Sequence, residues 1–141
     1  MPLLSRTRAI WSIAAVAATL TGCNLLDPAD PLPANAAMFS PPAEYEVWWQ
    51  RTEACSQLHG DVRRIEWFVV PNATQFDTPD GPKVGLWIHQ TGGVRIVVAG
   101  SYQDNELVVR HEMLHALLDR EGHPPEYFQD RCHLTWETWG E

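Results

Sequence analysis

The sequence predicts an α+β domain, built from an N-terminal helix, a small three-stranded and mainly antiparallel sheet, a second helix and a short C-terminal helix. Two stretches, residues 40–60 and 105–122, have helical patterning and end at a glycine. Between them lie three runs rich in β-branched and aromatic residues, as in strands. The domain is expected to cover residues 42–141, enough for a modest core.

The first helix is expected to begin at Ser40 and Pro41, because proline is favoured in the first turn of a helix. It is expected to end at Gly60 and to turn Trp48 and Cys55 towards the interior, with Trp49 and Leu58 as further candidates for that face.

Three runs are expected to form the sheet. Ile65–Val70 alternates between two faces. Residues 84–90 and 94–99 have the composition of two more strands, and Thr91-Gly92-Gly93 between them favours a hairpin. Residues 71–83 are polar and rich in turn-forming residues, so a loop is expected there.

The second helix carries the most informative pattern of the chain, His-Glu-Met-Leu-His at residues 111–115. Asp104 or Asn105 can cap its start. Positions four apart lie on one helical face, so His111 and His115 can direct both imidazoles at one metal ion. The non-functional alternative is two buried histidines with an unrelated glutamate between them.

These residue types are those of a zinc site. Glu112 follows the first histidine and can take a proton from a water bound to zinc. Catalytic zinc sites keep three protein ligands. His123 is the expected third ligand, because Gly122 lets the chain turn back towards the helix.

Glu126 and Glu137 are alternatives for the third ligand, as in gluzincins, and His133 is a further candidate ligand. The metzincin pattern fits poorly, because it needs glycine and histidine where this chain has Leu118 and Glu121. Candidates for stabilising an oxyanion are polar residues near the motif in sequence: Tyr102, Tyr127, Arg131 and His133.

Residues 111–128 resemble the active-site segment of the SprT-like and Spartan metalloproteases, in which a Gly-His turn follows the His-Glu-x-x-His helix. The resemblance implies a minimal zincin-like fold. It implies His111, His115 and His123 as zinc ligands and Glu112 as the catalytic glutamate. This chain departs from that family in having proline directly after the third histidine.

The resemblance implies zinc-dependent hydrolysis of peptide bonds, with a peptide or protein as substrate. In zincins the strand beside the active-site helix binds an extended substrate by β-augmentation, and residues 94–99 are expected to be this edge strand. Two alternatives are a non-catalytic zinc-binding envelope protein, acting in binding or assembly, and a zinc amidase acting on a non-peptide amide.

Residues 1–22 have the regions of a secretory signal peptide, with an apolar stretch at 9–20 that is shorter than the roughly twenty residues needed to span a bilayer. Leu-Thr-Gly-Cys at 20–23 resembles a bacterial lipobox, which implies lipid attachment to Cys23 and a place in the bacterial cell envelope. Asn24 favours the outer membrane. The alternative is an ordinary signal peptide followed by an incidental cysteine.

Residues 23–41 are rich in proline and are expected to be an extended tether. Removal of the leader, which holds two of the ten basic residues, would change the formal charge from −8 to −10. So acidic a chain is not expected to bind nucleic acid, whose partners present basic faces. We expect a monomer.

Cys55 and Cys132 are the cysteines left in the mature domain. An even pair in an exported chain favours a disulfide, with two buried free thiols as the alternative. The bond would tie the first helix to the segment behind the third expected ligand and would stabilise the domain by roughly 4 kcal/mol.

Overall fold

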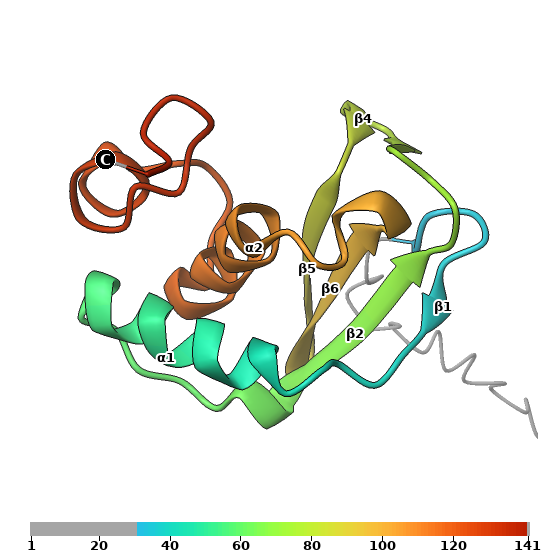
Figure 1. Cartoon of the computed structure of the whole chain (residues 1–141). Coiled ribbons are helices and arrows are strands. Elements are labelled where there is room, and N and C mark those ends of the chain that lie inside the picture. Colours follow the sequence, from blue (N-terminus) through green and yellow to red (C-terminus); the bar gives the residue numbers. More distant parts are fainter. Residues whose placement is uncertain (1–30, 141) are drawn as a thin grey trace, which may run out of the picture.

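The computed structural model describes residues 31–140 (Figure 1). The expected signal peptide and Cys23 lie outside the described residues. The elements in chain order are β1 Ala37–Met38, α1 Glu44–Ser56, η1 Val62–Arg64, β2 Ile65–Val70, β3 Phe76–Thr78, β4 Gly81–Lys83, β5 Gly85–Gln90, β6 Gly93–Ala99, η2 Gly100–Tyr102, α2 Glu106–Leu118 and η3 Glu126–Arg131. The protein belongs to the α+β class.

The main sheet of the described region is mixed and has four strands in the order β1-β2-β6-β5, instead of three. Strands β2 and β6 are parallel, whereas β1 pairs with β2 and β5 pairs with β6 in antiparallel fashion. The additional strand, β1, lies in the stretch expected to be a tether. The expected loop at residues 71–83 contains a second, two-stranded sheet, the β3–β4 hairpin.

Strand β6 lies inside the sheet, so the prediction that residues 94–99 form the edge is wrong. The parallel strand β2 occupies one side of β6, and β5 occupies the other. Residues Ile96, Val97, Val98 and Ala99 are all fully buried, as expected of a strand covered on both faces. The edge strand beside the second helix is therefore β5.

Helices α1 and α2 cover one face of the main sheet (Figure 1). Tyr45 and Trp49 of α1, Trp67 of β2 and Met113 of α2 belong to the core cluster between the layers. Phe76 of β3 belongs to a second cluster that covers the opposite face. No helix in residues 31–140 is long and apolar enough to cross a lipid bilayer.

Helix α1 differs from expectation in its bounds and its buried face. It begins at Glu44 and ends before Gln57, which adopts a left-handed conformation with φ of 62°, so Gly60 lies beyond the helix. The buried positions are Tyr45, Trp49, Thr52 and Ser56, whereas Trp48 is half-buried and stacks on Tyr45.

The buried face of α1 includes two residues with hydroxyl groups, Thr52 and Ser56, so it could not be recognised from apolar residues alone. Thr52 donates to the Trp48 carbonyl at 2.8 Å, and Ser56 donates to the Thr52 carbonyl at 2.6 Å. These local bonds satisfy both hydroxyls, so the residues can be buried.

Helix α2 has the expected N-cap. The side chain of Asn105 accepts a hydrogen bond from the Val108 amide at 3.1 Å. The helix ends at Leu118, and Asp119 follows in a left-handed conformation with φ of 49°. Gly122 has φ of 79°, a conformation that suits glycine and turns the chain back along the helix.

Candidate metal centre

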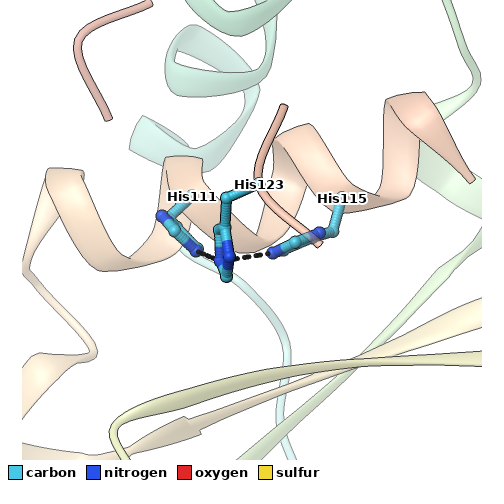
Figure 2. A group of neighbouring side chains, drawn as sticks. All are labelled: His111, His115 and His123. Carbon is cyan, nitrogen blue, oxygen red and sulfur yellow. Dashed lines mark hydrogen bonds between the residues drawn. The ribbon is translucent and has the colours of Figure 1, made fainter. Parts of the chain in front are cut away.

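Three histidines converge beside α2. His111 and His115 lie one turn apart on the helix, and His123 reaches over them from the segment that follows (Figure 2). The Nε2 atom of His123 lies 2.9 Å from Nε2 of His111 and 3.3 Å from Nε2 of His115. Four-coordinate zinc with bonds of about 2.05 Å would place neighbouring ligand nitrogens about 3.3 Å apart. The two separations from His123 are close to this value, and the ligand atoms of all three histidines lie within 4.8 Å of one another, so the group could hold a metal ion.

Backbone carbonyl groups orient both helical imidazoles. His111 Nδ1 donates to the Leu134 carbonyl at 2.7 Å, and His115 Nδ1 donates to the Arg120 carbonyl at 3.0 Å. Because a carbonyl oxygen only accepts, each neutral ring carries its hydrogen on Nδ1 and directs the Nε2 lone pair at His123. This tautomer is the one that binds a metal through Nε2.

The arrangement could hold a cation between the rings. His123 Nε2 can supply at most one hydrogen, yet it faces two lone pairs. Burial lowers the pKa of both His111 and His115 from 6.5 to about 4, so a proton is poorly held there at neutral pH. A metal ion could accept the lone pairs of all three nitrogens together.

Phe128 of η3 supports the three imidazoles from one side. Its fully buried ring lies 4.8 Å from the His111 and His115 rings and 4.9 Å from the His123 ring, measured between centroids. The indole of Trp87 stacks on His115 from β5. The ring orientations are therefore fixed by packing as well as by hydrogen bonds.

The side chain of Glu112 lies against Gly85 of β5. A Cβ built on Gly85 would lie 2.6 Å from Glu112 Oε1, so the carboxyl group fills the space that a side chain at position 85 would need. Burial raises the pKa of Glu112 to about 8, while the positive charge of Lys83 and a hydrogen bond from the Trp87 backbone oppose this rise. A carboxyl group with a pKa near neutrality can both accept and return a proton.

Alternate residues of β5 face α2 and meet successive turns of the helix. Gly85 lies against Glu112, Trp87 stacks on His115, and His89 Nδ1 lies 2.9 Å from a carboxylate oxygen of Asp119. The intervening residues Leu86 and Ile88 pack in the cluster on the other face of the sheet. The edge strand thus runs along the whole candidate site.

A cavity of about 650 Å³ opens above the histidines and Glu112. The β3–β4 hairpin and β5 supply one wall, and residues 134–137 supply the other. Figure 1 shows β4 and the C-terminal segment on opposite sides of α2. The cavity is large enough for a peptide segment of a few residues to enter.

The other predicted residues lie elsewhere or take other roles. Glu126 pairs with Arg131, and Glu137 lines the cavity, but neither belongs to the histidine group among the described residues. The four oxyanion candidates are absent from the cavity lining within residues 31–140. These are Tyr102, Tyr127, Arg131 and His133.

Sequence reasoning missed the contributions of Lys83, Gly85 and Trp87. They lie more than twenty residues before the histidines. Gly85 and Trp87 reach the site through the pairing of β5 with β6, and Lys83 does so from the β3–β4 hairpin that precedes β5. A signal for Gly85 is its position as an isolated glycine within a strand pattern, which often marks a close approach by another group.

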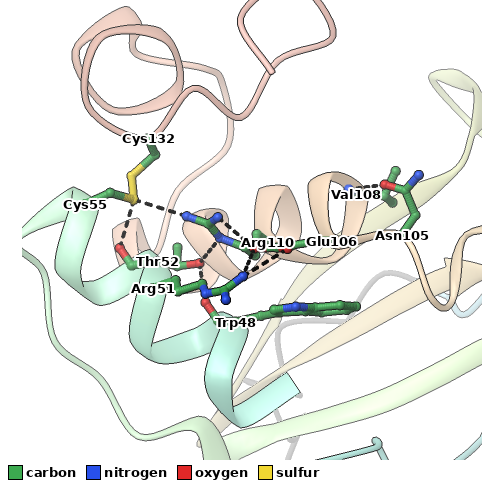
Figure 3. Close-up of polar contacts among 9 residues, drawn as sticks. All are labelled: Trp48, Arg51, Thr52, Cys55, Asn105, Glu106, Val108, Arg110 and Cys132. Atoms are coloured by element: carbon green, nitrogen blue, oxygen red, sulfur yellow. Dashed lines mark hydrogen bonds and ion pairs between the residues drawn. A yellow bond between two sulfur atoms is a disulfide. The ribbon is translucent and has the colours of Figure 1, made fainter. Parts of the chain in front are cut away.

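The structure joins Cys55 and Cys132 by a disulfide with a Cα–Cα distance of 5.1 Å (Figure 3). The bond links the last turn of α1 to a point two residues before Leu134, whose carbonyl orients His111. The buried guanidinium group of Arg110 lies beside it and donates to Thr52 Oγ1 at 3.1 Å and to Cys55 Sγ at 3.6 Å.

Comparisons with protein-family models, with curated proteins and with solved structures found no match to this chain.

Proposed function

We propose that the protein is a zinc-dependent hydrolase of peptide bonds with a zincin-like domain. The observation that carries this proposal is the convergence of three imidazole Nε2 atoms beside the buried carboxyl group of Glu112 at the base of one cavity. A structural metal site has no need of a buried carboxyl group at that position, and an open cavity leaves room for substrate.

The three histidines and Glu112 have different roles in the proposed reaction. His111, His115 and His123 would hold the ion, and zinc in such a site supplies an acidified water molecule and a Lewis acid for the substrate carbonyl. Glu112 accepts a proton as the water oxygen bonds to the carbonyl carbon. It returns this proton to the nitrogen as the carbon–nitrogen bond breaks.

The open side of β5 supports an extended peptide as the substrate. In residues 31–140, β5 pairs with β6 on one side and with no strand on the other. Its free backbone groups can add a peptide as a further strand and lay it along the cavity. Gly85 and Trp87 would then place the peptide next to both Glu112 and His115.

We further propose that the domain acts in the bacterial cell envelope, anchored through a lipid on Cys23. The Cys55–Cys132 disulfide supports an oxidising compartment. The negative formal charge, −8 before and −10 after loss of the leader, supports a partner other than nucleic acid.

Metal analysis combined with digestion of a peptide library tests the proposal on wild type and Glu112→Gln. Wild type should carry one equivalent of zinc and cleave peptides, whereas Glu112→Gln should keep its zinc and lose turnover because an amide cannot accept the proton.

Three outcomes would contradict the proposed peptide hydrolase. If both proteins bind zinc and neither cleaves any amide, a non-catalytic binding or assembly role becomes the better interpretation. Cleavage of non-peptide amides alone, lost in Glu112→Gln, would assign the amidase function. Absence of zinc from wild type would refute the metal centre.

A further inference from the structure

Lys83 is the only lysine in the sequence, and it lies in the wall of the cavity at the end of β4. Its side chain is half-buried. Within residues 31–140 this side chain makes no hydrogen bond and no ion pair, although most other charged groups near the core are paired. An ammonium group held at a cavity without a partner is available to a ligand.

The charge of Lys83 acts on one end of the site. After burial, which is the larger cause, the positive charge of Lys83 lowers the pKa of Glu112, His115 and His123. The pKa of His111 is influenced by His123 and not by Lys83. Among the described residues that line the cavity, Lys83 is the only lysine or arginine. The other charged lining residues are acidic: Asp80, Glu112, Glu121 and Glu137.

The hairpin that carries Lys83 is tied to the fold. Lys83 pairs with Phe76, whose side chain is buried in the cluster on the far face of the sheet. The turn is closed by Thr78 Oγ1, which donates to the Gly81 carbonyl at 2.7 Å. The ammonium group is therefore presented from an anchored position.

Hydrolysis of an amide creates a specific need for positive charge. When water adds to the carbonyl carbon, the electron pair of the carbonyl π bond moves to the oxygen, and Glu112 takes the proton from the water. Donors aimed at that oxygen stabilise the transition state most strongly where water is excluded. None of the residues expected from sequence to do this lines the cavity.

We propose that the Lys83 ammonium group donates a hydrogen bond to the substrate carbonyl oxygen and stabilises the negative charge that develops on it. Lys83 stays protonated throughout, so the proton moves only between water, Glu112 and the leaving nitrogen. This inference rests on the proposed hydrolase function, because the negative charge on the carbonyl oxygen develops only when water adds to the substrate carbonyl carbon.

The decisive experiment compares zinc-loaded wild type, Lys83→Met and Lys83→Arg in binding a phosphinic peptide, an anionic tetrahedral mimic, and the matching uncharged peptide. Lys83→Met should bind the phosphinic peptide 10²- to 10³-fold more weakly, the range for loss of one oxyanion donor. It should keep its zinc and its affinity for the uncharged peptide. Lys83→Arg should recover part of the loss.

Turnover gives a second, separable measurement. Lys83→Met should lower kcat by a similar factor with little change in KM, as expected of an interaction made only in the transition state. Arg63→Met is the matched control, since it removes the same charge from an exposed side chain that pairs with Asp61 outside the cavity.

The outcomes separate the two proposals. Equal affinity of wild type and Lys83→Met for the phosphinic peptide, with turnover that still depends on Glu112, overturns the role of Lys83 alone. Failure of wild type either to cleave peptides or to bind the phosphinic peptide overturns the hydrolase proposal and the role of Lys83 with it.

The single lysine also allows a test on the native sequence. Acetylation of amines removes the charge of Lys83, whereas reductive methylation keeps it. Acetylated protein should lose affinity for the phosphinic peptide and methylated protein should retain it. Because both reagents modify the N-terminal amine as well, equal loss in the two samples would contradict the proposal.

Discussion

Gly85 and Glu112 are in direct contact, although 27 positions separate them in the sequence. A Cβ at position 85 would lie 2.6 Å from Oε1 and 2.9 Å from Cγ of Glu112, both closer than side chains tolerate. The carboxyl group is thus held between the helix that carries it and the backbone of the edge strand. Glycine at position 85 is what allows this placement.

Gly85→Ala should displace the Glu112 carboxyl group and impair catalysis while leaving the metal bound. A shift of about 1 Å at a reacting group can cost on the order of 10²-fold in rate. We expect a loss of kcat of about that size with unchanged zinc content, measured by peptide cleavage and metal analysis.

A double variant isolates the cause. Gly85→Ala should lower the free energy of unfolding in the wild-type background. It should cost much less in a Glu112→Ala background, where the colliding atoms are gone. Equal destabilisation in both backgrounds would show that the cost comes from the strand and not from Glu112.

The proposed zinc ligands can be tested by metal content alone. Substitution of His111, His115 or His123 by alanine should each remove most of the bound zinc, because two imidazoles without a third leave an incomplete set. Glu126→Ala and Glu137→Ala should keep one equivalent. A full equivalent in His123→Ala together with a metal-free glutamate variant would assign the third ligand to that glutamate.

The disulfide should stabilise both the fold and the metal centre. Its closed loop spans 77 positions, for which the loss of chain entropy predicts about 4 kcal/mol. Cys55→Ser, Cys132→Ser and the double variant should therefore lose similar amounts of stability in denaturant unfolding.

The same variants should bind zinc more weakly, because the bond fixes the segment that carries Phe128 and the Leu134 carbonyl. Non-reducing peptide mapping should find Cys55 and Cys132 joined. Reaction of both cysteines with a thiol reagent in the folded, non-reduced protein would disprove the bond.

The pH dependence of the metal-free protein should report the buried Glu112. Its pKa is raised in the folded state from 4.5 to about 8, so its contribution to stability is complete below pH 4.5 and is lost as the pH rises towards 8. As the pH rises across this window, the free energy of unfolding of metal-free Glu112→Gln should increase relative to that of wild type, by about 1.4 kcal/mol per unit of pKa difference.

Urea unfolding of both proteins between pH 4.5 and 8 measures this difference. Burial lowers the pKa of His111 and His115 to about 4, and Glu112 is not among the causes of either shift, so their contribution should cancel in the comparison. Parallel stability curves would show that Glu112 is ionised in the folded protein throughout.

The anchor at Cys23 is testable in cells. Cys23→Ser should leave the precursor unprocessed or release the protein into the soluble fraction, whereas wild type should fractionate with membranes. Mass spectrometry of the mature protein decides the point. An unmodified cysteine, or cleavage at another position, would refute the lipid anchor.

The sequence was sufficient for the parts of the site that local geometry determines. His111 and His115 share a helical face at a spacing of four, and Gly122 marks the turn that returns His123 to them. Asn105 was recognisable as a cap because few side chains can serve there. In each case the physical cause lies within a few residues.

The remaining parts depend on pairing between distant segments. Strand β6 lies inside the sheet because of the order in which the strands pair. Its continuous run of apolar residues was the feature of the sequence that could have indicated burial on both faces. Neighbouring tryptophans at 48 and 49 left the inner face of α1 ambiguous until its contacts with the sheet fixed it. Lys83 belongs to no pattern at all.

The alternation of β5 also bears on how the specificity of this protein can evolve. Gly85, Trp87 and His89 contact Glu112, His115 and Asp119, and Leu86 and Ile88 pack in the core, so few substitutions at these positions of the strand are neutral. Exposed residues on both cavity walls lack these packing contacts. Asp80 and Pro82 lie on one side, and Trp136 and Glu137 lie on the other. Substitutions there could alter which peptides the proposed hydrolase accepts while Glu112 and the three histidines stay in place.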